Sequence, residues 1–184
     1  MKSIKVSELM VPLSEYATVS EEATLFEAVM ALEEAQARFD EARDRHRAIL
    51  VLNKNGQVVG KISQFDVLRS LEPKYEEIGD TKALSRFGWS AEFVKSVQRN
   101  YGLWEKPLHD ICRKAAQKRA RDIMGAPTEN EYISADATLD QAIHLLIMGS
   151  YQSLLVGSQE RIVGILRLTD VFREVCKMIK ACEL

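Results

Sequence analysis

Residues 60–66 read G-K-I-S-Q-F-D, and residues 164–170 read G-I-L-R-L-T-D. We call these stretches the first motif and the second motif. In each, an apolar run passes a glycine and reaches a hydroxyl residue near an aspartate, and an amphipathic segment follows. The pattern predicts a strand that runs directly into a helix, whose N-terminal N–H groups and dipole favour an anion. The alternative is capping alone, because Ser63 with Asp66 three residues later is close to a capping box.

The two motifs belong to a longer internal repeat. The tripeptide A-T-L at residues 23–25 recurs at residues 137–139, which is 114 positions later. Each copy also opens with an apolar residue and a methionine, at residues 9–10 and 123–124. The motifs themselves are only 104 positions apart, so the first copy carries ten additional residues. Because the matches keep their order, we infer a duplication in which one element of the first copy is longer.

Each copy predicts the order strand, helix, strand, strand, helix. In the first copy a short strand at 18–19 precedes a helix with apolar residues on one face and no breaker before about Arg45. About nine of the additional residues fall in this helix and lengthen it by roughly 14 Å. A hairpin at 48–62 with an Asn-Gly turn follows, and the last helix ends before Pro73. The second copy places these elements at 133–134, 139–147, 153–156, 161–166 and 169–181.

The residues between the copies form a third region. Residues 73–119 match neither copy and are too apolar for a flexible linker. Ser90 and Pro107 mark two helix starts. We expect two or three helices that pack on the repeats or on a partner. The apolar residues expected to be buried are Leu84, Phe87, Trp89, Phe93, Val97, Tyr101, Leu103 and Trp104.

Composition excludes several classes of protein. The 184 residues are 46% hydrophobic and 28% charged, and the net charge of −2 gives no general attraction to nucleic acid or to an anionic membrane. The cysteines at 112, 176 and 182 form no C-x-x-C pair, and their odd number argues against a disulfide framework. The N-terminus lacks a secretory signal, and no apolar run approaches the ~20 residues of a membrane span. We therefore expect a soluble cytoplasmic protein with reduced thiols.

The repeated element order and the two motifs resemble a tandem pair of cystathionine-β-synthase (CBS) domains. The resemblance covers residues 6–71 and 120–180, and we divide the chain into a first repeat at 1–72, a helical insert at 73–119 and a second repeat at 120–184. It implies an α+β (α/β-like) fold, in which two β-α-β-β-α repeats pack around a pseudo-twofold axis beside the inserted helices. In this family the clefts between repeats often bind AMP, ADP, ATP or S-adenosylmethionine as a regulatory ligand, and no cofactor is required.

The resemblance also assigns ligand contacts in the first copy. Asp66 would accept hydrogen bonds from the ribose hydroxyls, and Ser63 would contact phosphate. Arg47, just before the middle strand, would be a second phosphate contact, and His46 beside it is a weaker candidate. Thr18, on the first strand, is included among the candidate ligand residues. Carboxylates suit a diol, whereas hydroxyl, guanidinium and helix N–H groups suit phosphate.

In the second copy the corresponding contacts are Asp170 for ribose and Thr169 for phosphate. Arg167 stands where a hydroxyl is common in the family. This departure either provides an additional phosphate ligand or blocks the cleft. Gln152 takes the place of the basic residue before the middle strand, so the second cleft lacks that cation.

Catalysis and nucleic-acid binding find little support. The histidines at 46, 109 and 144 have no metal-ligand spacing, and the nucleotide-binding glycine motifs of enzymes are missing. The basic run at 113–121 has two interpretations. It is either a nucleic-acid patch or a helix face that is solvated or ion-paired, with the acidic residues of the long first helix as the expected counterpart, and the second interpretation is favoured.

We therefore expect a stand-alone regulatory module without enzymatic activity. It would form a homodimer, bind an adenine nucleotide or a related adenosyl ligand, and signal through an unknown protein partner. The alternative is a ligand-free interaction scaffold built on the insert and the long first helix. A regulator associated with nucleic acid is the third hypothesis.

Overall fold

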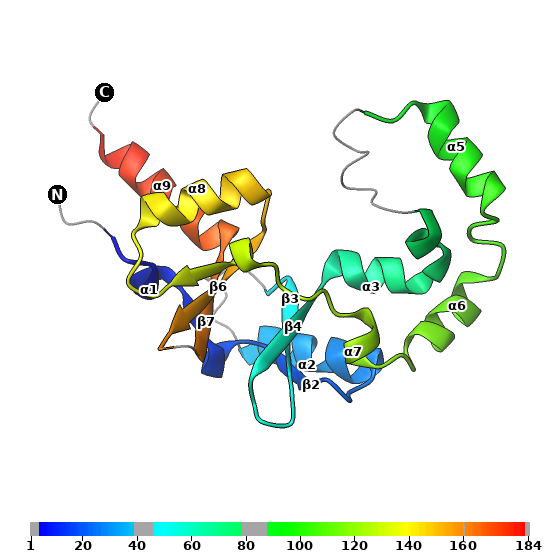
Figure 1. Cartoon of the computed structure of the whole chain (residues 1–184), viewed down its shortest axis with the longest axis horizontal. Coiled ribbons are helices and arrows are strands. Elements are labelled where there is room, and N and C mark those ends of the chain that lie inside the picture. The colour runs from blue at the N-terminus through cyan, green and yellow to red at the C-terminus, as the bar shows by residue number, and fades with distance from the viewer. Residues whose placement is uncertain (1–3, 39–45, 79–87, 160, 183–184) are drawn as a thin grey trace.

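The computed structural model describes residues 4–38, 46–78, 88–159 and 161–182 (Figure 1). Each copy contributes one sheet. The first sheet has the order β2 (Thr18–Ser20), β3 (Ala48–Leu52), β4 (Val58–Ser63). The second has the order β1 (Val11–Pro12), β7 (Arg161–Arg167), β6 (Ser153–Ser158), β5 (Tyr132–Ser134). The α-helices of the copies are α1 (Val6–Leu9), α2 (Leu25–Arg38), α3 (Gln64–Leu71), α7 (Ala120–Ile123), α8 (Leu139–Gly149) and α9 (Leu168–Ala181).

Both copies have the predicted order of strands and helices. The first strand of each pairs in parallel with the second strand, and the second and third strands form an antiparallel hairpin. The ladders shift register at equivalent points, after Val51 in β3 and after Val156 in β6. The predicted α+β pair of repeats is confirmed. The predicted continuation of the first helix to about Arg45 lies outside the described residues.

The segment that opens each copy packs on the other copy. Val6 of α1 is fully buried in the core of the second copy, and Ala120 of α7 is fully buried in the core of the first. Strand β1 joins the second sheet by pairing with β7. The two opening segments are therefore exchanged between the repeats at 1–72 and 120–184.

This exchange explains why each copy combines a methionine at its opening with a glycine in its motif. A Cβ at Gly164 would lie 2.5 Å from the backbone oxygen of Val11 and 3.0 Å from Sδ of Met10. A Cβ at Gly60 would collide with the side chain of Met124. Each motif glycine therefore leaves the space in which the opening segment of the other copy crosses the strand.

The two sheets face each other across a shared apolar layer. Leu50 of β3 and Leu155 of β6 occupy equivalent positions on the two middle strands, and both are buried. Val11, Tyr16 and Ile165 complete this layer. Equivalent strands thus meet at the centre of the molecule, as expected for copies related by a pseudo-twofold axis.

The insert projects beyond α3, on the right of Figure 1. It contains η2 (Pro73–Ile78), α5 (Ala91–Asn100) and α6 (Leu108–Ala115). Both predicted helix starts are confirmed: the Ser90 side chain accepts a hydrogen bond from the Phe93 amide, and Pro107 precedes α6. The turn after α5 is tied to the end of α3, since the Trp104 amide donates to the carboxylate of Glu72, the C-cap residue of that helix, at 3.0 Å.

The predicted burial of the insert is only partly correct. Val97 and Leu103 are buried, but Phe93, Tyr101 and Trp104 are 46%, 38% and 38% exposed. The reason is that α5 extends along the insert and does not lie on a sheet, so one side of it faces outward (Figure 1). Trp89 is half-buried. The remaining two residues of that prediction, 84 and 87, lie outside the described residues.

Candidate functional site

Backbone pairing brings the candidate residues of the first copy to one edge of its sheet. Ala48 pairs with Ser63, so Arg47 lies beside the start of α3. Thr18 begins β2, which runs parallel to β3, so it lies at the same end of the sheet. We call Thr18, Arg47, Ser63 and Asp66 the first motif edge. Arg47 is exposed, and the other three are half-buried.

Ser63 and Asp66 form a complete capping box. The amide and the hydroxyl of Ser63 both donate to Oδ2 of Asp66, at 2.8 and 2.6 Å, and the Asp66 amide donates to Oγ of Ser63 at 3.3 Å. The capping interpretation is therefore confirmed as a structural role. Both bonds to the carboxylate end on Oδ2, which makes the cap compatible with a ligand contact at the second oxygen.

His46 is not part of an accessible edge. Its side chain is fully buried and meets the ring of Tyr16 edge to face, with the ring centroids 4.3 Å apart. Burial, together with the nearby Arg167 charge, lowers the pKa of His46 to about 4. His46 is therefore a neutral core residue at neutral pH, and we leave it out of the proposed site.

The second motif has a different arrangement at the start of its helix. Arg167 donates from Nε to Oδ2 of Asp170 at 2.5 Å and from a terminal nitrogen to Oδ1 at 2.7 Å. The two side chains are only 6% and 10% exposed. A second cation, Arg173, lies 3.8 Å from Oδ1. Both oxygens of the aspartate that was predicted to bind ribose are therefore engaged within the chain.

Two buried residues of the first copy, Tyr16 and His46, lie near this pair. Burial raises the pKa of Tyr16 to about 12, and the charges of Arg167 and Asp170 act on the same hydroxyl in opposite directions. The same two charges act on the pKa of His46, which Arg167 lowers and Asp170 raises. Tyr16 was not predicted as a site residue, because a lone tyrosine before a short strand carries no distinctive signal.

A second buried ion pair joins the copies. Nζ of Lys61 on β4 contacts the carboxylate of Glu131, whose 3₁₀ helix η3 (Glu129–Glu131) leads into β5. Their side chains are 18% and 11% exposed. Lys61 pairs with Leu50 in the ladder and therefore faces the shared apolar layer, where the second copy has Ile165. A lysine at an inward position of an apolar strand was the available signal, and the sequence reasoning missed it.

The remaining candidates of the second copy lie around this motif. Thr169 is half-buried in the first turn of α9. Gln152 is exposed, and its backbone oxygen accepts from the Leu168 amide at 3.0 Å. The structure thus brings together Gln152, Arg167, Thr169 and Asp170, but the arginine occupies the position at which Ser63 stands in the first copy.

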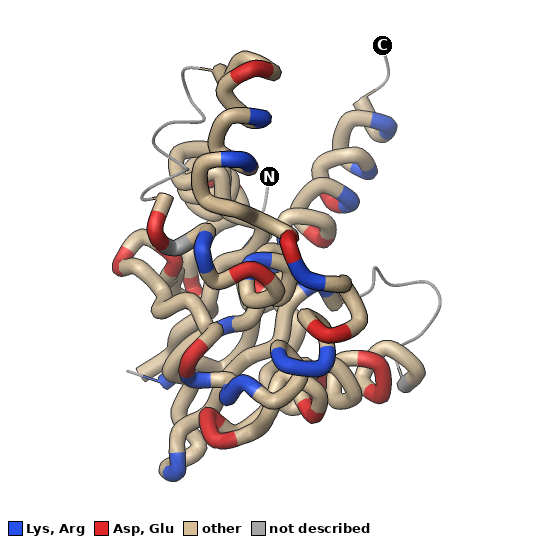
Figure 2. The backbone as a smooth tube through the Cα atoms, turned by 90° about the vertical axis from the view of Figure 1, so that its right-hand side faces the viewer, with Lys and Arg blue, Asp and Glu red and all other residues tan. Residues whose placement is uncertain are grey.

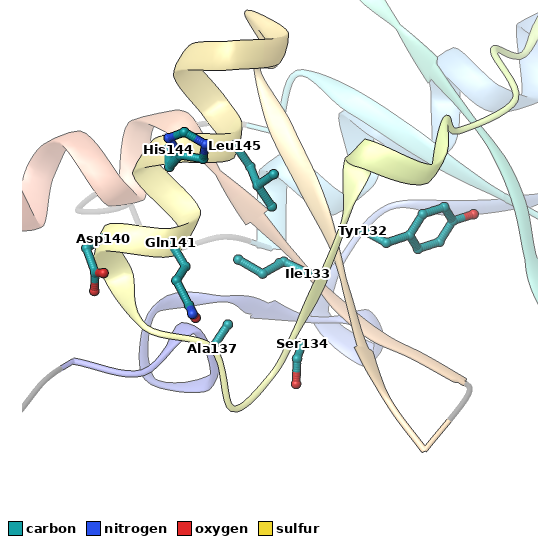
Figure 3. A pocket seen from close by; sticks show the side chains of 8 residues that line it. All are labelled: Tyr132, Ile133, Ser134, Ala137, Asp140, Gln141, His144 and Leu145. Atoms are coloured by element: carbon teal, nitrogen blue, oxygen red, sulfur yellow. The ribbon is translucent and has the colours of Figure 1, made fainter.

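Two cavities in the described part of the chain lie away from both motifs. One, of about 540 Å³, lies between β5 and α8, where Ile133 and Leu145 approach each other and Tyr132 extends from the opposite side of the strand (Figure 3). Asp140, Gln141 and His144 line its helical side. The other, of about 590 Å³, lies at the end of α5. Neither of these two contains a predicted ligand residue.

The basic run of the insert is largely engaged within the chain. Arg121 pairs with the Glu22 carboxylate at 2.5 Å, and Arg119 donates to the Glu22 backbone oxygen at 2.6 Å. Lys118 donates to the Ser70 backbone oxygen at 2.8 Å. Acidic and basic residues are interspersed over this side of the molecule (Figure 2). The ion-paired interpretation is supported, although the acidic partner is Glu22, just before α2, and not a residue of the helix.

The described residues give no further class of site. No group of three or more His, Cys, Asp or Glu side chains among them is placed to hold a metal ion. No helix in the described ranges is both long enough and apolar enough to cross a membrane.

Comparison with known proteins agrees with the geometry. The chain is similar to the CBS-pair protein CBSX2 from Arabidopsis thaliana, with 18% identity over 98% of this chain and 100% of that chain and a TM-score of 0.62. It is similar to CBSX2 in complex with AMP, with 18% identity over 95% and 98% and a TM-score of 0.57. It is also similar to a putative acetoin utilization protein (AcuB) from Vibrio cholerae, with 14% identity over 97% and 95% and a TM-score of 0.59.

No protein of curated function matches the chain in sequence. The family model of the CBS domain, however, matches it twice, at residues 6–73 and 120–177. These two matches contain both motifs and together span most of the chain, so the protein belongs to the CBS domain family, as a tandem pair.

Proposed function

We propose that this CBS pair is a regulatory protein that binds an adenine nucleotide or a related adenosyl ligand at the first motif edge. Its activity is regulatory and not catalytic, and ligand binding changes its contacts with a protein partner. The three cysteines, at positions 112, 176 and 182, are all free thiols, which supports a reducing, cytoplasmic environment.

The observation that carries the proposal is the chemistry of the first motif edge. Asp66 offers a carboxylate oxygen to the two hydroxyls of a ribose. Arg47 and the amides of the first turn of α3 are donors suited to phosphate, and the Ser63 hydroxyl becomes one when it turns away from Asp66. The AMP complex of CBSX2, which shares the fold, supports this ligand class.

The test is a titration of the full chain with AMP, ADP, ATP and S-adenosylmethionine, followed by thermal unfolding. A ligand at a hundred times its dissociation constant adds about 2.7 kcal/mol of stability. For a chain of this length the melting temperature then rises by roughly 5–10 °C. If none of the four ligands at millimolar concentration shifts the melting temperature, the proposal is rejected.

Substitutions locate the site. Asp66→Asn keeps a capping group but removes the charge, so affinity falls by one charge-assisted hydrogen bond, about 1.5–3 kcal/mol. Asp140→Asn is the matched control, since Asp140 lies in the first turn of α8 and lines the cavity of Figure 3. A loss of affinity in Asp140→Asn but not in Asp66→Asn would place the ligand in that cavity.

A homodimer or protein scaffold is the second candidate, and exposed apolar side chains favour it. Phe65 of α3, Phe172 of α9 and Ile147 of α8 are 77%, 66% and 70% exposed. Apolar side chains concentrated on helices are typical of protein–protein interfaces. Light scattering tests this candidate: the expected mass is that of a dimer, and Phe65→Glu together with Phe172→Glu reduces it to that of one chain.

A further inference from the structure

We propose that Arg167 closes the second motif from within the chain, so that each chain binds one adenosyl ligand, at the first motif edge. This inference rests on the proposed function and specifies which of the two equivalent motifs binds the ligand. The carrying observation is a difference between helix starts. Oδ2 of Asp66 accepts from Ser63, whereas both oxygens of Asp170 accept from Arg167.

The Arg167–Asp170 contact has the geometry of a strong interaction. A guanidinium that donates two parallel bonds to one carboxylate matches it in charge, in shape and in the number of donors. A ribose diol offers two neutral donors to the same oxygens. For the diol to bind Asp170, the guanidinium must leave and take its charge to a new partner, although its side chain is only 6% exposed. An adenosyl ligand therefore competes poorly at this position.

The surroundings of the second motif also favour closure. Tyr16 is 6% exposed and His46 is fully buried, and both lie close enough to feel the charges of the ion pair. The position in the second copy that corresponds to Tyr16 is Asn130, which is exposed. A buried aromatic residue of the first copy thus lies near the charged pair of the second motif, whereas the equivalent position of the second copy holds an exposed polar residue.

The number of cations beside the motif aspartate also differs between the two copies. Arg167 and Arg173 both lie near the Asp170 carboxylate. Lys61, the half-buried cation of β4, contacts Glu131 of the other copy. The contacts described for the Asp66 carboxylate are therefore those of the helix cap, and both end on Oδ2. Its second oxygen remains available to donors from a ligand.

The test is calorimetric titration of the full chain with AMP. The expected stoichiometry is one AMP per chain. Asp170→Asn leaves the affinity within about twofold of the parent, whereas Asp66→Asn lowers it at least tenfold. Two AMP molecules per parent chain, or a tenfold loss in Asp170→Asn, would overturn the proposal.

Reciprocal substitutions test the role of Arg167 directly. Arg167→Ser gives the second motif the hydroxyl of the first, and the expected result is a second AMP per chain. Ser63→Arg does the reverse without breaking a buried ion pair, and it lowers the affinity for AMP at least tenfold. Circular dichroism checks the fold of each variant, and Ser63→Arg decides the matter if Arg167→Ser does not fold. Parent-like affinity in Ser63→Arg contradicts the proposal.

The outcomes also separate the two proposals. If the parent does not bind AMP but Arg167→Ser binds one molecule, the proposed site at the first motif edge fails and the closure by Arg167 stands. If the parent binds one AMP and Arg167→Ser still binds one while folded, the proposed function stands and the closure is rejected. If neither binds AMP, both proposals are rejected.

Discussion

The two copies place one cation each on the inner face of their hairpins, half-buried in the first and buried in the second, and each cation has a different role. Lys61 of the first copy contacts Glu131 of the second, so this pair ties the copies together. Arg167 contacts Asp170 three residues later, so this pair ties a strand to the helix that follows it within one copy. The cations also sit at different points of equivalent strands, since Lys61 corresponds to Ile165 and Arg167 corresponds to Ser63.

This difference separates the residues that packing requires in both copies from those that can differ between them. The glycine, the methionine that crosses it and the leucines of the shared layer are repeated, because each fills a space that the pseudo-twofold arrangement imposes on both copies. The polar groups at the helix starts are not under that constraint, since several arrangements satisfy the same backbone amides. One copy therefore has a Ser–Asp helix cap, and the other has an internal ion pair.

The largest expected effect is on stability when the internal pair of the second copy is broken. Arg167→Met leaves the Asp170 carboxylate buried without its bidentate partner, and we expect a loss of about 3–5 kcal/mol in the free energy of unfolding. Lys61→Met breaks a less buried contact and costs less. Urea denaturation measures both. An equal loss in the two variants would contradict the distinction between the pairs.

The double variant Arg167→Met with Asp170→Asn provides the control. It removes the charge that the single substitution strands, so part of the lost stability returns. If the double variant is as unstable as the sum of the single variants, Arg167 stabilises the protein through apolar packing of its stem and not through the carboxylate.

The second prediction concerns pH and the buried residues that the first copy places against this pair. The pKa of His46 is about 4 in the folded protein, against about 6.5 for an unfolded histidine. Between these values the unfolded state binds a proton that the folded state does not, so stability falls as the pH drops from 6.5 to 4, by at most about 3.4 kcal/mol. Above pH 6.5 this group has no effect.

His46→Leu removes this contribution while it keeps a buried side chain of similar size. Denaturation in urea at pH 7.5 and at pH 5 compares the two proteins. The expected outcome is a smaller loss of stability at pH 5 in the variant than in the parent. An equal loss of stability between pH 7.5 and pH 5 in the parent and the variant would show that groups other than His46 cause the loss at acidic pH. The neighbouring charged and titratable groups are Tyr16, Arg167 and Asp170.

Much of the fold could be predicted because its signals are local. Periodicity and turn residues indicated the hairpins, and Ser90 and Pro107 indicated the two insert helices. The exchange of the opening segments could not be predicted in this way, since residues 6–10 carry the same apolar pattern whichever sheet they join. The exposure of Phe93 and Trp104 was also missed, because hydrophobic composition does not reveal whether a helix projects from the body.

The sequence could predict that the candidate residues lie close together, but it could not predict the contacts of their side chains. The motifs brought Arg47, Ser63 and Asp66 to one edge through strand register alone. Whether Arg167 would bind a phosphate or block the cleft depends on the conformation of its side chain. The sequence does not determine that conformation. The contact between Lys61 and Glu131 joins residues 70 positions apart and likewise has no local signal.

The third prediction compares the two motif glycines. Gly164→Ala places a methyl group against the backbone oxygen of Val11, so β1 must move away from β7. Gly60→Ala meets the side chain of Met124, which can change its rotamer more easily than a paired strand can move. We expect Gly164→Ala to cost about 2–3 kcal/mol and Gly60→Ala about 1 kcal/mol. Thermal unfolding measures both, and the reverse order would contradict the stated contacts.

The smallest expected effect concerns the helix caps. Ser63 caps α3, whereas Arg167, at the same position of α9, makes no side-chain cap bond to the backbone. Ser63→Ala exposes the Asp66 amide and removes one donor to the carboxylate, so we expect a loss of about 1 kcal/mol. Ser63→Thr keeps the hydroxyl and is the control. The same substitution also removes a proposed phosphate contact, so Ser63→Ala lowers affinity for AMP beyond its effect on stability, and Ser63→Thr retains most of the binding. Chemical denaturation with and without AMP separates the two effects: an equal loss of stability in both conditions would mean that Ser63 only caps the helix.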